Sequence, residues 1–160
     1  MTVGLYANTL TQKEKDAEVK CLAQNIYFEA RGSSFADQAA VADVVINRVN
    51  SSSYPNTICK VVKQGIMSKW WKKVHNKDVP VKNKCQFSWF CDGKSDDVTD
   101  IDSWNKARVL AYKVYYNRFY IGLTEGATHY HAHYVNPKWA KKLQMTGTIG
   151  SHKFYRKTLR

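Results

Sequence analysis

Glu29 is the acidic residue whose position best suits acid–base chemistry. Apolar residues recur at helical spacing from about Asp16 to Arg31. On a wheel of about 100° per residue, Glu29 lies roughly 20° from Leu22, at the border of the apolar stripe. Partial burial and the negative end of the helix dipole would both raise the pKa of its carboxyl group. A carboxylic acid that stays protonated near neutral pH can deliver a proton to a leaving oxygen, as glycoside cleavage requires. An ion pair with Arg31 or another base is the alternative.

Asp37 is the nearest other acid and the reserve candidate for a base that activates water. It falls in the first turn of a second predicted helix, from Phe35 to about Asn50, which Ser33 or Ser34 would cap. The helix dipole favours an anion there, so a structural role is the alternative to catalysis. The rest of this helix is apolar nearly all round, which predicts a helix buried at the centre of the domain.

A run of polar and aromatic residues near the C-terminus offers a second set of candidate groups. Alternation over residues 127–136 predicts a strand that places Thr128 and Tyr130 on one face. As a functional interpretation, this face looks toward the Glu29 side of a cleft and its hydroxyls hydrogen-bond a sugar. The other face would carry three histidines, His129, His131 and His133. Such histidines can bind zinc, but no acidic or cysteine fourth ligand is adjacent, so no metal or other cofactor is predicted. A packed β-hairpin is the alternative, with residues 146–154 as a second strand or an irregular return.

Two further segments supply candidates for substrate binding. In the segment QFSW, the amide of Gln86, the hydroxyl of Ser88 and the ring of Trp89 are groups that grip amide-bearing sugars, whereas Phe87 is expected in the core. Trp139 follows Pro137 and would line the cleft or brace it.

Positive charge is the clearest feature of the composition. Lysines and arginines outnumber acids by 25 to 13, which gives a net charge of +12 and predicts binding to a polyanion or an anionic surface. Nucleic acid and the bacterial envelope both fit this charge. Residues 68–84 are lysine-rich, carry Trp70 and Trp71, and predict a basic surface excursion. One interpretation of this stretch is an amphipathic patch that meets the envelope or a membrane. The favoured alternative is a solvated basic loop with its tryptophans tucked inward.

Length and hydropathy predict one α+β domain over residues 1–160, with a loose arm at 1–12. No segment approaches the roughly 18 consecutive apolar residues of a membrane span. The N-terminal residues lack the basic start, apolar core and cleavage site of a secretory signal, so the expectation is a protein made and left in the cytoplasm.

The cysteines leave several pairings open. They are Cys21, Cys59, Cys85 and Cys91. They form no CxxC pair and match no common zinc spacing, and four cysteines allow three connectivities. Cys85 or Cys91 could pair with Cys59 if the fold brings them close, and four buried thiols are the alternative.

Several co-linear motifs give the chain a family resemblance. They are IYFEARG (26–32), FADQAAVADVVINRVNSSSYPNTIC (35–59), CQFSWFCDG (85–93), GATHYHAHYVNPKWA (126–140) and GTIGSHKFYR (147–156). Together they resemble the cell-wall hydrolase family of spore-cortex-lytic enzymes, the SleB/CwlJ type, over about residues 19–156. The resemblance implies a mostly helical α+β domain similar to lysozymes and lytic transglycosylases, with a small β element lining the cleft.

The family uses a single glutamate in its EAR motif, which here is Glu29. The resemblance implies that the substrate is the glycan strand of peptidoglycan, cut between N-acetylmuramic acid and N-acetylglucosamine. Glu29 would protonate the glycosidic oxygen and then act as base toward the muramic acid C6 hydroxyl, leaving a 1,6-anhydromuramic end. Many members carry an acid where this chain has Ser33; the departure removes a nearby charge and leaves the assignment of Glu29 intact.

A single-domain, strongly basic member without a signal is most similar to a phage endolysin. Such a protein would stay in the host cytoplasm until a holin opens the membrane, then reach the anionic envelope as a monomer. The alternatives are a hydrolytic muramidase, a zinc amidase, and a non-enzymatic module that binds wall polymers or nucleic acid. Pure binding gains nothing from a carboxylate at the apolar border, so no specific nucleic-acid partner is expected.

Overall fold

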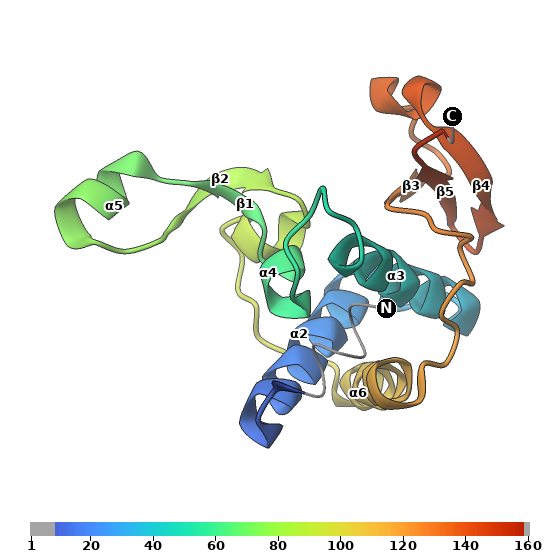
Figure 1. Cartoon of the computed structure of the whole chain (residues 1–160), viewed down its shortest axis with the longest axis horizontal. Helices are drawn as coiled ribbons and strands as arrows, with labels where there is room; N and C mark the ends of the chain where they lie inside the picture. Colours follow the sequence, from blue (N-terminus) through green and yellow to red (C-terminus); the bar gives the residue numbers. More distant parts are fainter. Residues whose placement is uncertain (1–8, 159–160) are drawn as a thin grey trace.

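The computed structural model describes residues 9–158, and its elements carry the labels of Figure 1. The helices are α2 (Gln12–Ala30), α3 (Phe35–Val49), α4 (Ile58–Val62), α5 (Lys69–His75) and α6 (Ile101–Asn117), with short 3₁₀ helices η1 (Ser88–Cys91) and η2 (Lys138–Lys142). The strands are β1 (Gly65–Met67), β2 (Pro80–Cys85), β3 (His129–Ala132), β4 (Gln144–Ile149) and β5 (His152–Arg156). The predicted α+β class is confirmed.

Helix α3 lies at the centre of the helical core, as its apolar sequence predicts. The Ser34 hydroxyl caps it by accepting a hydrogen bond of 3.2 Å from the backbone N–H of Asp37. Alanines and valines are almost completely buried along most of its length. Helix α2 packs against α3, α4 and α6, so the four helices share one apolar core.

Helix α4 is held against α2 by a buried carboxylate and a disulfide. The Glu18 carboxylate accepts hydrogen bonds from the backbone N–H groups of Ile58 (2.6 Å) and Cys59 (3.1 Å), which compensates the exposed donors at the start of α4. One turn further along α2, Cys21 is bonded to Cys59. The second disulfide joins Cys85 to Cys91. Cys59 therefore pairs with Cys21, rather than with Cys85 or Cys91 or remaining a thiol.

Polar side chains of α3 hold the loop that leads from α6 to β3. The Asp43 carboxylate is buried and accepts hydrogen bonds from the backbone N–H of Gly122 and from both the N–H and hydroxyl of Thr124, at 2.6 to 2.9 Å. The Asn47 amide donates to the carbonyl oxygen of Ala127 at 2.8 Å. Because Ala127 lies two residues before β3, these bonds fix where that strand begins.

The C-terminal sheet has three antiparallel strands in the order β3-β5-β4, one more than the sequence predicts. Strand β3 pairs with β5 so that Tyr130 lies opposite Phe154. Phe154 is completely buried against Ala40 and Val44 of α3, which anchors the sheet to the helices. Residues 146–154, predicted as a second strand or an irregular return, instead form parts of two strands, because Gly150, with a φ of 56°, turns the chain between β4 and β5.

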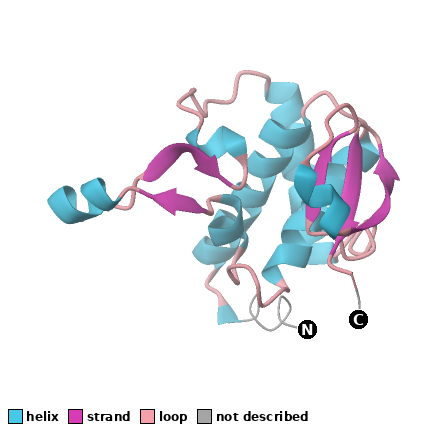
Figure 2. Cartoon of the chain, turned by 90° about the horizontal axis from the view of Figure 1, so that it is seen from above, coloured by secondary structure: helices cyan, strands magenta, loops and turns pink. Residues whose placement is uncertain are grey.

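The lysine-rich stretch forms a finger rather than a loop. Strands β1 and β2 pair in antiparallel fashion and carry α5 between them. Figures 1 and 2 show this finger extending away from the helices, on the side opposite the C-terminal sheet. Strand β1 has only three residues and β2 has six, and neither shows a clear alternation of apolar residues, which is why the sequence does not predict them.

At its N-terminal end, α2 begins at Gln12, about four residues before the predicted start, because the Thr11 side chain caps it. Residues 1–8 of the predicted loose arm lie outside the described part of the chain. Within residues 9–158, none of the helices combines the length and apolarity needed to cross a bilayer.

We predict that the two disulfides stabilise the fold unequally. The Cys21–Cys59 bond spans 38 residues and the Cys85–Cys91 bond spans 6. Loop-closure entropy then gives about 4 kcal/mol for the first and about 2 kcal/mol for the second. Urea unfolding of the paired serine variants should show the larger loss for Cys21→Ser with Cys59→Ser. An equal or smaller loss than for Cys85→Ser with Cys91→Ser would contradict this ranking.

Candidate active site

Glu29 lies in the last turn of α2, and its carboxylate points toward the C-terminal sheet. The side chain is half-buried. The hydroxyl of Tyr130, on strand β3, donates a hydrogen bond of 2.7 Å to Glu29 Oε2. The expectation that Glu29 lies at the border of the apolar surface and that Tyr130 faces it is confirmed. The two residues are 101 positions apart in the chain, so the fold alone brings them together.

Burial is the dominant influence on the Glu29 carboxyl group and raises its pKa above the ordinary value. Three neighbours oppose this effect and favour the carboxylate: Tyr130 through its hydrogen bond, and Arg48 and His152 through electrostatic interactions. The net shift is upward. Glu29 can therefore hold a proton at higher pH than an exposed glutamate, while the carboxylate left by proton transfer has partners ready to stabilise it.

Tyr130 keeps the proton that it donates to Glu29 to higher pH than an exposed tyrosine would, because its pKa is raised. Burial and the negative charge of Glu29 raise the pKa of Tyr130 well above its ordinary value. Its ring packs edge-on against His152, at 5.0 Å between centroids, and lies 5.7 Å from Phe154. These contacts fix the ring, and so the position of its hydroxyl.

Asp37 is fully buried and its carboxylate is occupied. His152 Nδ1 lies 2.7 Å from Oδ1 and 3.0 Å from Oδ2, and the backbone N–H of Ser151 donates to Oδ2 at 3.2 Å. A Cβ atom on Gly150 would lie 2.7 Å from Asp37 Cβ, so the β4–β5 turn closes tightly over this carboxylate. The structure thus places Asp37 behind His152, where it orients the imidazole, and not beside open solvent.

Arg48 is a buried cation close to Glu29. Its Nε donates to the carbonyl oxygen of Thr128 at 2.8 Å. Its guanidinium carbon lies 4.9 Å from the ring centroid of Phe87 and 5.0 Å from that of Tyr54. Its Nη1 is buried and has no hydrogen-bond partner among the described residues. The charge of Arg48 therefore acts on Glu29 through a poorly solvated region, where it is weakly screened.

The QFSW segment lies at the edge of this site. Phe87 is buried against Arg48, which confirms its expected core role, while the flanking Gln86 and Ser88 are exposed. Trp89 is buried, donates from Nε1 to Asn25 Oδ1 at 2.9 Å, and stacks on Phe28. The outward side chains of the segment are therefore Gln86 and Ser88, whereas the ring of Trp89, which was expected to grip sugar, faces the core.

Thr128 and Trp139 occupy different sides of strand β3. The Thr128 hydroxyl lies 2.9 Å from His129 Nδ1, and its carbonyl accepts the bond from Arg48. Trp139 packs against His129, His131 and Tyr155, with ring centroids 5.2 to 5.6 Å apart, on the face opposite Tyr130. Trp139 therefore braces the sheet.

The described residues include no group of three or more His, Cys, Asp or Glu side chains arranged to hold a metal ion.

Arg48 and His152 were not among the predicted site residues. The signal for Arg48 is that a helix apolar nearly all round still carries Asp43, Asn47 and Arg48, since polar groups in a buried helix need specific partners. His152 gives no comparable signal, because its neighbour Asp37 lies 115 positions away.

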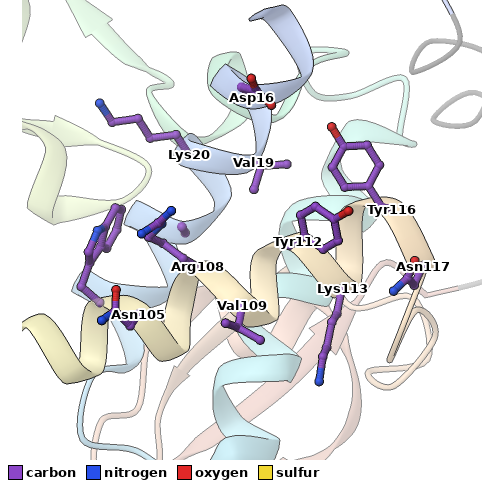
Figure 3. Close-up of a pocket in the computed structure, with 12 residues that line it drawn as sticks. Asp16, Val19, Lys20, Asn105, Arg108, Val109, Tyr112, Lys113, Tyr116 and Asn117 are labelled. Carbon is purple, nitrogen blue, oxygen red and sulfur yellow. The ribbon is translucent and has the colours of Figure 1, made fainter. Parts of the chain in front are cut away.

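A cavity of about 780 Å³ between α2 and α6 lies apart from Glu29. Figure 3 shows Lys20 on α2 and Arg108, Tyr112 and Lys113 on α6 among the residues around it. Its carboxylate, Asp16, is exposed and accepts a hydrogen bond from Gln12. An exposed carboxylate of this kind lacks the burial that prepares Glu29 for proton donation.

The chain belongs to the cell wall hydrolase family, whose model matches residues 32–155. Glu29 lies three residues before this match. Among curated relatives, the chain is 42% identical to a spore cortex-lytic enzyme of Bacillus subtilis over 45 residues, and 34% identical to that of Oceanobacillus iheyensis over 61 residues. These matches cover 28% and 38% of this chain, but only 15% and 22% of the relatives' own lengths.

Two solved structures resemble the whole fold. One is the catalytic domain of SleB from Bacillus cereus, with a TM-score of 0.57 and 25% identity over 87% of this chain and 89% of that one. The other is the catalytic domain of the germination-specific lytic transglycosylase SleB from Bacillus anthracis. It has a TM-score of 0.59 and 25% identity over 93% and 98% of the two chains. The fold is thus that of the SleB catalytic domain, a lysozyme-like α+β domain.

We predict that Glu29→Gln stabilises the protein at neutral pH. Between the ordinary glutamate pKa and the raised pKa of folded Glu29, the folded state binds more protons than the unfolded state. The free energy of unfolding of the wild type therefore falls as the pH rises through that window. The variant lacks this loss, so it should be more stable by about 1 kcal/mol at neutral pH, and the gain should vanish in acid.

Urea unfolding at a series of pH values measures this difference. Glu14→Gln is the matched control, because it removes the same charge from the exposed first turn of the same helix. A gain that is independent of pH, or equal in both variants, would argue against a raised pKa at Glu29.

Proposed function

We propose that the protein is a lytic transglycosylase that cleaves peptidoglycan glycan strands between N-acetylmuramic acid and N-acetylglucosamine. The observation that carries this proposal is the half-buried Glu29, whose pKa is raised by burial and whose carboxylate is hydrogen-bonded to Tyr130. Membership of the cell wall hydrolase family supports the substrate class. The likeness of the fold to the lytic transglycosylase SleB of Bacillus anthracis supports the reaction type.

In the first step, the Glu29 carboxylic acid donates its proton to the glycosidic oxygen. The bond from that oxygen to the muramic acid C1 breaks, the N-acetylglucosamine side leaves as an alcohol, and C1 acquires oxocarbenium character. Glu29 is now a carboxylate. The Tyr130 hydroxyl and the charge of Arg48 favour this form, and so lower the free energy of the charge-separated state.

In the second step, the same carboxylate accepts the proton of the muramic acid C6 hydroxyl while the C6 oxygen bonds to C1. A 1,6-anhydro ring forms, Glu29 regains its proton, and no water is consumed. One carboxylate therefore suffices for both steps. This agrees with the position of Asp37, whose oxygens are engaged by His152 and Ser151. A hydrolytic muramidase with Asp37 as the water-activating base is the second candidate, and it would require that carboxylate to leave its partners.

The substrate is proposed to bind along the polar groups around Glu29. Gln86 and Ser88 offer an exposed amide and hydroxyl at the edge of the site, and the half-buried Thr128 and Tyr130 offer hydroxyls from the sheet. Trp139 would contribute by bracing the sheet behind His129 and His131.

The zinc amidase alternative lacks a converging ligand set among residues 9–158. A binding module without activity would not need a carboxyl group with a raised pKa at Glu29.

A role as a phage endolysin is proposed on the charge of the chain. The net charge of +12 would draw the protein to the phosphate- and carboxylate-rich envelope. The predicted residence in the host cytoplasm until lysis, and the monomeric state, stay predictions. The cytoplasm keeps thiols reduced, so on this account both disulfides would close after release.

We predict that purified peptidoglycan treated with the wild-type protein yields muropeptides with 1,6-anhydromuramic ends. Mass spectrometry distinguishes them from reducing ends, since the anhydro product lacks one water. Glu29→Gln should release at least a hundredfold less, because it can neither donate nor accept the proton. Glu14→Gln, the same change at the exposed end of α2, should release as much as the wild type.

The possible products separate the alternatives. Products with reducing muramic ends would show that the enzyme is a hydrolytic muramidase and not a transglycosylase. Release of free peptide stems that a metal chelator abolishes would indicate a zinc amidase. Full release by Glu29→Gln would refute the role of Glu29.

A further inference from the structure

The finger, defined as residues 65–85, concentrates both positive charge and exposed apolar surface. It holds six lysines and one aspartate, so it carries a large part of the net charge of +12. It also holds five large apolar side chains that remain exposed, namely Ile66, Met67, Trp70, Trp71 and Val74. The active site proposed above uses none of these residues.

The base of the finger is held firmly. The Cys85–Cys91 disulfide ties the end of β2 to η1, and a Cβ atom on Gly65 would lie only 2.7 Å from Cys85 Sγ. The backbone N–H of Ser68 donates to the carbonyl of Val79 at 2.8 Å, which closes the ladder just below α5. The finger is therefore braced at its base and directs its tip away from the helices, as Figures 1 and 2 show.

The tip carries a small aromatic cluster that is open to solvent. Trp70 and Trp71 pack edge-on at 5.1 Å between centroids, and His75 lies 4.7 Å from Trp71. Trp70 is 58% exposed and Trp71 is 37% exposed, so the favoured expectation that both are tucked inward is wrong. A seven-residue helix with no core of its own cannot bury them. Val74, on the same helix, is 53% exposed.

Lysines surround this cluster. Lys69, Lys73 and Lys77 are exposed, and Lys72 pairs with Asp78 at 3.3 Å. Exposed tryptophan and aliphatic side chains are costly in water, and a rim of ammonium groups would repel a second copy of the same surface. The surface instead complements a partner that offers both negative charge and an apolar phase.

We propose that the finger docks the protein on an anionic phospholipid surface. Tryptophan side chains favour the interface between headgroups and acyl chains, and lysine stems can lie along it while their ammonium groups meet lipid phosphates. A polyanion such as a wall polymer or nucleic acid would satisfy the lysines, but it offers no apolar phase for Ile66 and Val74. The finger and the sheet that carries Tyr130 lie on opposite sides of the helices, so docking leaves the Tyr130 side uncovered.

Vesicle binding by the full chain tests this proposal. We expect co-sedimentation with vesicles of equimolar phosphatidylglycerol and phosphatidylcholine, with a blue shift of tryptophan emission, and much weaker binding to phosphatidylcholine alone. Replacing Lys69, Lys73 and Lys77 by glutamate should lower the partition coefficient by about a hundredfold or more. Trp70→Ala with Trp71→Ala should lower it by about tenfold and abolish most of the blue shift.

The matched control replaces three exposed lysines elsewhere by glutamate, so that the net charge changes equally. These lysines are Lys138, Lys141 and Lys142 of η2. The control should bind vesicles nearly as well as the wild type. Equal losses in the control and the lysine variant would mean that net charge alone acts, which would overturn the proposal. So would wild-type protein that sediments with purified cell wall but not with anionic vesicles. Because the assay needs no substrate, its outcome is independent of the proposed glycosidase activity.

Discussion

Hydrogen bonds from one buried helix join the C-terminal third of the chain to the helical core. Four polar side chains of α3 make them: Asp37, Asp43, Asn47 and Arg48. Each is bonded to a loop or strand between residues 122 and 152, where leaving a donor or acceptor unpaired would cost about 1–3 kcal/mol. These bonds set the position of β3, and β3 carries Tyr130 to Glu29. The site geometry thus depends on α3, although the proposed proton donor, Glu29, lies on α2.

The same arrangement explains how one carboxyl group can serve as both acid and base. Burial favours the protonated form of Glu29, whereas Tyr130, His152 and Arg48 favour the carboxylate. The opposing effects bring the two protonation states closer in free energy than burial alone would, which suits a group that gives up a proton and then takes one back. A structure selected only for stability would have no reason to keep a half-buried acid there.

The sequence predicts those features that follow from local patterns. The ends of α3 and the apolar border at Glu29 follow from helical periodicity and capping residues, and strand alternation places Thr128 and Tyr130 on one face. That this face meets Glu29 depends on the fold, because the two residues are 101 positions apart. The Cys21–Cys59 pairing, the Asp37–His152 contact and the position of Arg48 depend on segments that are far apart in the chain. The finger could not be predicted because its short strands are stabilised by a disulfide and a backbone ladder rather than by apolar alternation.

The central claim, that Glu29 is the proton donor, is tested most directly by titrating its side-chain carboxyl carbon by ¹³C NMR, assigned by difference from Glu29→Gln. The titration is compared with the alkaline limb of the pH dependence of kcat/KM on glycan strands. Both should give the same pKa, above that of an ordinary glutamate, and Tyr130→Phe should move both to higher pH by removing the bond that favours the carboxylate. A Glu29 that titrates as an exposed glutamate in an active enzyme, or an alkaline limb that does not follow it, would contradict the account.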